Sequence, residues 1–278
     1  MSTYESYAKV AGSYDGMRVP VGAEIIFGHL SLVGRPLGDF ALLDAGCGTG
    51  NYSRALAGQV GKVTSLDLSP DMLAVARAKL EKEEQAGRVA FREGSITALP
   101  FPEACFDGVM FNQVLHHLED GKDPDYPGHG RAVAEAFRVL KPGGVVVINV
   151  CTHEQLKHGF WYYDLIPGAL AAVLGRCVSA ERLTAHIKAA GFRFHGRSVP
   201  LDGLLFDDGY FQAEGPLEAS WRKADSIWAL ADGAELAAAE ARIESLRAAG
   251  QLEAYLGEQD RARQALGQCT FFTGQKPS

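Results

Sequence analysis

The chain has 278 residues, of which 47% are apolar and 22% charged, the balance of an ordinary globular protein that can bury a full core. A formal net charge of −7 and the lack of any Lys/Arg run argue against a protein that lies along nucleic-acid phosphates. No apolar run reaches the roughly 18–20 residues needed to span a bilayer, and the N-terminus lacks the basic start and apolar run of a secretion signal.

The cysteines indicate a reducing compartment. They are scattered, odd in number and without CxxC spacing: Cys47, Cys105, Cys151, Cys177 and Cys269. Such a set is neither a disulfide framework nor a zinc site. We therefore expect a cytoplasmic protein with no bound metal.

Short apolar runs alternate with helical stretches through the first 150 residues, which is the pattern of βαβ units around a parallel sheet. The expected strands are 41–45, 63–68, 89–93, 108–111, 145–150, 192–200 and 269–275. The expected helices are about 52–59, one that begins at Ser69-Pro70, 131–140, 180–190, and two within 233–267 that are separated at Gly250. An irregular aromatic segment follows residue 150.

The last two expected strands are separated by about 68 residues, far more than a hairpin turn needs. We therefore predict an α/β fold: a Rossmann-like, seven-stranded, mostly parallel sheet with helices on both faces and a helical insertion between the last two strands. Residues 1–200 plus 269–278 would form the main domain, and 201–268 the insertion. The helices of 233–267 are either a pair packed on that domain or a cap over its site.

A glycine-rich loop follows the first strand, in the order Gly46-x-Gly48-x-Gly50. A dinucleotide fingerprint needs its third glycine where this chain has Asn51, and a phosphate-binding Walker loop needs a Gly-Lys-Ser/Thr that is absent. The loop can turn tightly and let a ligand approach its backbone, but it has neither phosphate-binding pattern.

An acid, Asp67, ends the second strand, 21 residues after Gly46. An acid at that position is placed to accept hydrogen bonds from two ribose hydroxyls. Glycines and a ribose-binding acid without a phosphate cradle fit an adenosine ligand that carries no phosphate. S-adenosylmethionine is such a ligand.

Four motifs in order resemble those of the class I S-adenosylmethionine-dependent methyltransferases. They are LLDAGCGTG, VTSLDLSPDML, EGSITALPFPEACFDGVMFNQVLHHLED and EAFRVLKPGGVVVINV. Together with an N-terminal segment that contains Tyr7 and Tyr14, they are most similar to the small-molecule subgroup that includes ubiquinone and menaquinone C-methyltransferases. The resemblance covers about residues 7–151.

The resemblance implies a set of roles around S-adenosylmethionine and its product S-adenosylhomocysteine. Gly46, Gly48 and Gly50 would wrap the methionyl part, and Asp44 would help to fix its ammonium group. Asp67 would hold the ribose. The remaining contacts would come from Leu68, Met72, Ser95 and Ile96 around the adenine, from Asn112 and Gln113 at the methionyl group, and from Tyr14 at the sulfonium. Many relatives have Asp where Ser95 stands, so the adenine contact differs here.

Methyl transfer requires a base only if the acceptor must lose a proton. His116 and His117, just after the fourth strand, are the nearest titratable candidates, with His117 favoured and His153 a third. Either His116 or His117 could instead cap the following helix or pack beneath the cofactor.

The acceptor site is expected where the chain leaves the fifth strand, because ligands in open α/β sheets bind at that edge. Its histidines and aromatic residues suit an aromatic or apolar acceptor with a polar handle. The aromatic residues could equally anchor the insertion. The expected acceptor residues are Tyr7, Cys151, His153, His158, Trp161, Tyr162 and Tyr163.

Other functions remain as alternatives. Cys151 at the mouth of the site would suit a thiol or arsenic-type metalloid acceptor. A protein that binds S-adenosylmethionine without turnover would keep residues 44–113 and lack an acceptor pocket. A nucleic-acid base N-methyltransferase would need an Asn/Asp-Pro-Pro-aromatic motif, where this chain has Asn112-Gln113-Val114-Leu115. We expect a small-molecule partner, no nucleic acid, no membrane span, and either a monomer or a homodimer.

Overall fold

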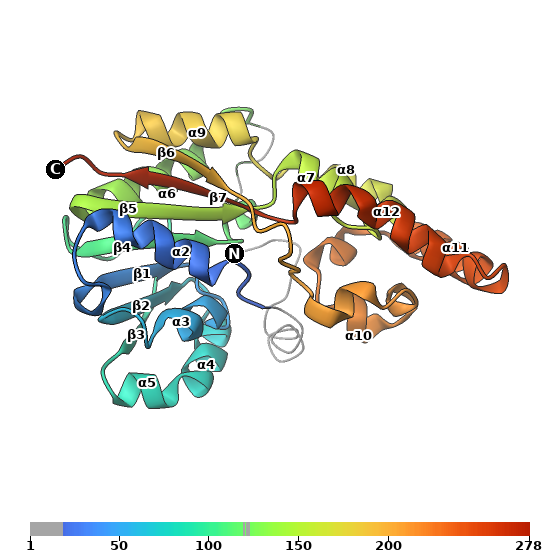
Figure 1. Ribbon diagram of the computed structural model, residues 1–278, viewed down its shortest axis with the longest axis horizontal. Helices are drawn as coiled ribbons and strands as arrows, with labels where there is room; N and C mark the ends of the chain where they lie inside the picture. The colour runs from blue at the N-terminus through green and yellow to red at the C-terminus, as the bar shows by residue number, and fades with distance from the viewer. Residues whose placement is uncertain (1–18, 119, 121–122) are drawn as a thin grey trace.

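The computed structural model of the protein describes residues 19–118, 120 and 123–278. Within them, the core is a seven-stranded sheet with the order β3-β2-β1-β4-β5-β7-β6 (Figure 1). Its strands are β1 (Ala41–Ala45), β2 (Lys62–Asp67), β3 (Val89–Glu93), β4 (Phe106–Asn112), β5 (Leu140–Val150), β6 (Arg193–Ser198) and β7 (Thr270–Gln275).

Strands β1 to β5 run parallel, and β7 is inserted antiparallel between β5 and β6. The chain runs outward from β1 through β2 to β3, and then resumes on the other side of β1 with β4. The carboxyl ends of β1 and β4 therefore flank a topological switch point, the place where open α/β sheets bind ligands. The expected Rossmann-like, mostly parallel sheet is confirmed.

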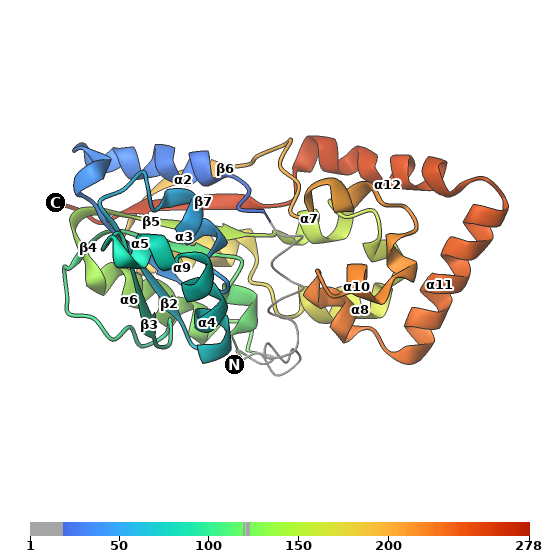
Figure 2. The same ribbon diagram turned by 90° about the horizontal axis from the view of Figure 1, so that it is seen from below.

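Helices cover both faces of the sheet. Alternate residues of a strand point to opposite sides, so both faces of the sheet carry apolar side chains that a helix can bury. Leu42 packs with Ile26 and Leu56 on one face, whereas its neighbour Leu43 packs with Val133 and Ile187 on the other. Figure 2 shows these two helical layers on either side of the strands. The helices around the sheet are α2 (Ala23–Leu30), α3 (Asn51–Leu56), α4 (Pro70–Lys79), α5 (Glu81–Gln85), α6 (Pro127–Val139) and α9 (Ala180–Ala189).

Local signals account for several helix ends. Ser69 accepts a hydrogen bond from the Met72 amide, with Pro70 at the first helical position of α4, as expected. Helix α6 begins at Pro127, earlier than the expected residue 131, because proline is well suited to the first helical turn. Helix α2 was not expected. It has no side-chain cap, and burial of Ile26 and Leu30 stabilises it instead.

The remaining helices form a lobe beyond the carboxyl edge of the sheet, at the right in Figures 1 and 2. They are α7 (His153–His158), α8 (Pro167–Leu174), α10 (Ala219–Arg222), α11 (Gly233–Ala248) and α12 (Leu252–Leu266). The break between α11 and α12 lies at Gly250, whose φ of 66° is left-handed, as the sequence indicated.

The segment after β5 is more regular than expected. Helix α7 begins with a capping box, in which Thr152 accepts a hydrogen bond from the Gln155 amide and the Gln155 side chain returns one to the Thr152 backbone. Helix α7 packs against α12, and α8 against the segment 226–230, so two stretches far apart in sequence share one helical lobe. No helix in the described part of the chain is long and apolar enough to cross a membrane.

Candidate functional site

A large cavity opens at the switch point and encloses about 1220 Å³ of space, part of it open to solvent. We call it the donor cavity. Its lining includes the cofactor residues expected from the sequence, apart from Asp44, Gly50 and Tyr14: Gly46, Gly48, Asp67, Leu68, Met72, Ser95, Ile96, Asn112 and Gln113. Tyr14 and Tyr7 lie outside the described residues. In the sequence, Asp44 lies two residues before Gly46, and Gly50 lies between the lining residues Thr49 and Asn51.

The three loop glycines all have left-handed φ values, but they serve different purposes. A Cβ on Gly46 would lie 2.3 Å from a methyl carbon of Val114, so the loop packs tightly there. At Gly50, a Cβ would press on Ala76 and Leu80 at 3.1 Å. At Gly48, a Cβ would meet nothing within 4 Å. Gly48 is therefore the position where the backbone faces open space that a ligand can fill.

Asp67 is fixed at the tip of β2 by two backbone donors. The amide of Gly48 donates to its Oδ2 at 2.8 Å and the amide of Ser69 to its Oδ1 at 2.9 Å. Burial raises the pKa of Asp67 above its usual value, while these backbone donors oppose the rise. A carboxylate oxygen can accept more than one hydrogen bond, and Asp67 lines the cavity, so it suits a ligand with two adjacent hydroxyls.

Asp44 and Asn112 lie at the ends of the neighbouring strands β1 and β4 and are almost fully buried. Asp44 Oδ2 accepts a hydrogen bond from Ser53 Oγ at 2.6 Å. Its Oδ1 and both polar atoms of the Asn112 amide have no other partner within the described residues, and the Asn112 side chain lies close enough to Asp44 to lower its pKa. Burial raises the pKa of Asp44 to about 7. These unpaired atoms call for a ligand with polar or cationic groups.

The far side of the donor cavity is mainly apolar. Met72 and Ile96 are buried there, whereas Leu68 is 43% exposed although it lines the cavity, so a flat ligand would cover it. Ser95 Oγ accepts a hydrogen bond from the Thr97 amide at 3.2 Å. Ser95 Oγ also shares a hydrogen bond with Thr97 Oγ1 at 2.9 Å, so an adenine would have to compete with partners that the hydroxyl already has.

The donor cavity suits a nucleoside without phosphates. None of the described residues that line it is Lys or Arg, so it offers no cationic side chain to a phosphate. The acids Asp67 and Asp44 instead suit ribose hydroxyls and an ammonium group. The residues present thus fit S-adenosylmethionine, which carries both and has a cationic sulfur.

Gln113 lies at the junction of the donor cavity with a second cavity and has a left-handed φ of 50°, which is unusual for a residue other than glycine. Its amide nitrogen Nε2 donates to Asn149 Oδ1 at 3.0 Å. Asn149 in turn donates to the Tyr52 hydroxyl at 2.9 Å. This buried chain of hydrogen bonds holds the boundary between the two cavities.

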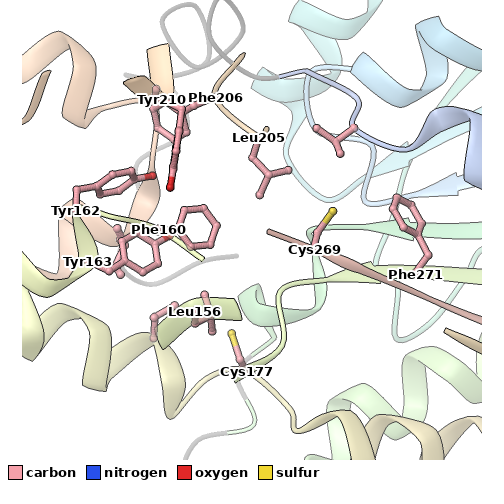
Figure 3. Close-up of a cluster of buried hydrophobic side chains, with 14 of the residues drawn as sticks. Leu156, Phe160, Tyr162, Tyr163, Cys177, Leu205, Phe206, Tyr210, Cys269 and Phe271 are labelled. Carbon is pink, nitrogen blue, oxygen red and sulfur yellow. The ribbon is translucent and has the colours of Figure 1, made fainter. Parts of the chain in front are cut away.

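The second cavity encloses about 680 Å³ and shares Gln113 and Leu205 with the donor cavity. Figure 3 shows Leu205 between the aromatic residues of the lobe and Cys269 and Phe271 on the sheet side. The other residues that line it are Leu115, His116, His129, Val150, Cys151, Leu156, Phe160, Tyr163, Val173, Cys177, Val178, Asp225, Ser226 and Ile227. No described residue of α11 or α12 is among them.

The expected acceptor residues divide between the second cavity and its surroundings. Cys151 and Tyr163 line the cavity. Trp161 and Tyr162 are buried behind it, where the Trp161 ring donates to the Tyr210 backbone at 2.7 Å. His158 is exposed on α7 and lines neither cavity.

The three candidate bases lie in different places. His117 lines the donor cavity and His116 the second cavity, with their ring centroids 4.0 Å apart. Burial holds the pKa of His117 well below its usual value, and the neighbouring His116 lowers it further. His153 lines neither cavity, and its Nε2 is 2.7 Å from the backbone oxygen of Cys177, to which it donates.

The lobe end of the second cavity carries a buried carboxylate, Asp225, which is 5% exposed. The hydroxyls of Tyr162 and Tyr163 both donate to its Oδ2, at 2.8 and 2.9 Å. The Phe160 ring stacks on Tyr163 at 4.4 Å. The lobe end of the second cavity thus carries a polar group that could orient a ligand, in addition to the polar residues elsewhere in its lining.

Sequence reasoning missed several residues of the two cavities, among them Tyr52, Leu205, His129 and Asp225. Tyr52 follows the glycine loop directly, so its closeness in sequence was a usable signal. Leu205, His129 and Asp225 carried none, because each reaches the site from a segment that only the folded chain brings there.

Known proteins resemble the chain in sequence and in fold. Residues 43–148 match the family described as "Methyltransferase domain". A demethylmenaquinone methyltransferase of Lactococcus lactis is 40% identical over 129 residues, which are 44% of this chain and 48% of that protein. A ubiquinone/menaquinone biosynthesis C-methyltransferase UbiE of Shewanella sediminis is 30% identical over 176 residues, which are 62% of this chain and 67% of that protein.

A solved structure from Anabaena variabilis, described as a candidate methyltransferase of an antibiotic biosynthesis pathway, has a similar fold. Its TM-score is 0.70 at 21% identity, and the match covers 92% of this chain and 98% of that one. The match to the Lactococcus relative spans about half of that protein's length.

Proposed function

The chain belongs to the class I S-adenosylmethionine-dependent methyltransferases, and from that premise we propose that it methylates a small, largely apolar acceptor bound in the second cavity. One observation carries the proposal: the donor cavity and the second cavity adjoin at Gln113 and Leu205. An acceptor in the second cavity would therefore meet the donor at their common boundary.

The donor supplies a methyl group that its cationic sulfur already activates. The chief task of the protein is then to hold the acceptor in line with that methyl group, and orientation of this kind contributes about 7–11 kcal/mol in favourable cases. Asp67 and Asp44 would hold the two ends of the donor. The hydrogen bond to Asn149 would hold the Gln113 side chain in place, so that the boundary between the two cavities stays open where donor and acceptor meet.

The lining supports an apolar or aromatic acceptor with a polar handle. Leu115, Leu156 and Phe160 are buried apolar residues, whereas Asp225 and His116 provide polar groups in the same lining. Burial holds the pKa of His117 low, so this histidine beside the donor is neutral and is a candidate base.

A thiol or metalloid acceptor is a second candidate, because Cys151 and Cys177 line the same cavity. Soft metalloids bind thiolates, however, and burial raises the pKa of Cys177 to about 12, so this thiol stays protonated at neutral pH. The cysteines therefore favour an apolar lining over a metalloid trap.

The test is transfer of a labelled methyl group from S-adenosylmethionine to a panel of small metabolites, together with calorimetry of donor binding. Asp67→Ala should weaken donor binding by about 100-fold, because hydrogen bonds to a charged group contribute about 1.5–3 kcal/mol each. Glu93→Ala is the matched control, since Glu93 is the exposed acid paired with Asp67 on β3. Donor binding without transfer to any acceptor would favour a non-catalytic binding protein, and equal binding by Asp67→Ala and the wild type would refute the donor site.

A further inference from the structure

A buried histidine in the second cavity has no role in the function proposed so far. His129 is the third residue of α6, and its side chain is 1% exposed. Its Nδ1 is hydrogen bonded to Asp120 Oδ2, whereas its Nε2 has no partner within the described residues. A buried polar atom left unpaired costs about 1–3 kcal/mol. Because the ring lines the second cavity, a ligand there is the natural partner for Nε2.

Asp120 is itself held firmly in place. The amide of Gly128 donates to its Oδ1, and the amide of His129 donates to its Oδ2 at 3.2 Å. A Cβ on Gly128 would lie 2.5 Å from Asp120 Oδ1, so the glycine lets the carboxylate approach the start of α6. Burial alone would raise the pKa of Asp120, but the bonds from His129 and from the backbone bring that pKa below its usual value.

This arrangement defines the protonation state of His129. Burial lowers its pKa, and Asp120 opposes that change, so the ring is neutral at neutral pH. With a charged carboxylate at Nδ1, the proton of the neutral ring lies on Nδ1 and the lone pair on Nε2. A carboxylate that orients a histidine in this way is the arrangement that prepares an imidazole to accept a proton.

The surroundings contain other titratable groups. His186, on α9, faces the same region and lowers the pKa of His129, and the Tyr126 ring meets the His129 ring edge-on at 5.2 Å. Across the second cavity lie His116, Cys151, Tyr163, Cys177 and Asp225. Asp120 is the carboxylate bonded to the ring, so it is the group placed to stabilise a positive charge on it.

We propose that His129 accepts a proton from an acidic hydroxyl of the acceptor, that Asp120 positions His129, and that the second cavity therefore takes a phenol or an enol. This rests on the proposed function. The hydroxyl proton moves to Nε2, and the acceptor's electron pair forms the new bond to the methyl carbon. The bond from that carbon to sulfur breaks and leaves its electron pair on sulfur. The imidazolium next to Asp120 later returns the proton to water.

The test uses 4-nitrophenol, whose absorption changes when it ionises, added to the full chain saturated with S-adenosylhomocysteine. Bound 4-nitrophenol should ionise at a lower pH in the wild type than in His129→Asn, by about one pH unit or more. The phenolate would lie beside the imidazolium that has taken its proton, and an opposite charge this close shifts an acid by about 1–3 units. In His129→Asn the amide can replace Nδ1 as donor to Asp120, so α6 keeps its contact. His158→Asn, on the exposed surface, should behave as the wild type.

Asp120→Asn separates positioning from structure. It retains an oxygen for the Gly128 amide but removes the charge, so nitrogen NMR of the histidines should show His129 in a mixture of tautomers and the ionisation shift of 4-nitrophenol should shrink. An unchanged tautomer and shift would make Asp120 merely structural and overturn its assigned role.

Two results would overturn the assignment of His129: equal ionisation in the wild type and His129→Asn, or no saturable binding of 4-nitrophenol while calorimetry still shows that S-adenosylhomocysteine binds. In both cases the proposed methyltransferase function would stand. Loss of S-adenosylhomocysteine binding by the wild-type chain would instead refute the proposed function itself.

Discussion

The donor cavity and the second cavity adjoin, but they are built in different ways. Nearly all described residues of the donor cavity come from 46–118, from loops that follow successive parallel strands. The second cavity draws on segments from residue 113 to residue 227, including the start of α6 and the lobe. The first depends on backbone conformation at the sheet edge, and the second on side chains that meet only after the lobe has folded.

That difference has an energetic side. The donor cavity is lined by left-handed glycines, and next to its lining the buried acid Asp44 has one oxygen without a partner in the described residues, so this region is prepared for a ligand at a cost in stability. The lobe side of the second cavity is a packed aromatic cluster whose polar groups are mostly paired (Figure 3). Replacing the unpaired acid should therefore change how stability depends on pH, whereas replacing a paired group on the lobe side should only lower stability.

The largest effect is expected at Asp44. Its pKa is about 7 in the folded protein against an ordinary 3.8, a difference worth about 4 kcal/mol. Because the folded value is the higher one, this stability is fully present below about pH 4 and is lost as the pH rises to about 7. Asp44→Asn should flatten this part of the pH dependence in urea unfolding of the ligand-free protein. An unchanged slope would show that Asp44 is not the responsible group.

The same acid links pH to donor binding. An ammonium group beside Asp44 favours the charged carboxylate, so binding near pH 6 should release a proton. Calorimetry in buffers of different ionisation enthalpy measures that release directly. Asp44→Asn should abolish it.

Gly46→Ala should destabilise the protein by roughly 3 kcal/mol. A left-handed backbone costs an L-residue about 1–2 kcal/mol, and the overlap with Val114 adds about 1–3 kcal/mol. Gly48→Ala is the control, because its φ is also left-handed but its Cβ would enter open space: it should lose only the backbone cost of about 1–2 kcal/mol and still obstruct the donor. Equal losses of stability in the two variants would contradict the distinction between these glycines.

Tyr163→Phe tests the lobe side. Loss of its hydrogen bond to Asp225 should cost about 1–3 kcal/mol in thermal unfolding, because a buried acceptor loses one of its donors. Affinity for S-adenosylhomocysteine should not change, since Tyr163 does not line the donor cavity. A matching drop in that affinity would mean that the two cavities are not independent.

The smallest effect is expected at His158. It is exposed and lines neither cavity, so His158→Ala should change stability by less than about 0.5 kcal/mol and leave methyl transfer unaltered. A clear loss of methyl transfer would place His158 at the acceptor site, where the sequence pattern predicted it.

Much of the sheet and of the donor cavity could be predicted from the sequence. Buried strands such as Ala41–Ala45 show as short apolar runs, and the loop after such a strand must lie at the carboxyl edge of a parallel sheet. Gly48 and Asp67 could thus be assigned to that edge, because each directly follows or ends such a run. Helix α2 could not be predicted, because it has no capping signal and depends on burial against the sheet.

The fold class and the edge of the sheet where the donor cavity lies could be derived from local properties of the chain: apolar periodicity, turn-forming glycines and strand-end acids. The side chains that form the second cavity could not, because they meet only in the folded protein. Leu205, Asp225 and His129 come from three separate segments, and nothing near each one in sequence encodes the others. Their meeting depends on long-range packing of the lobe against the sheet, which no local pattern records.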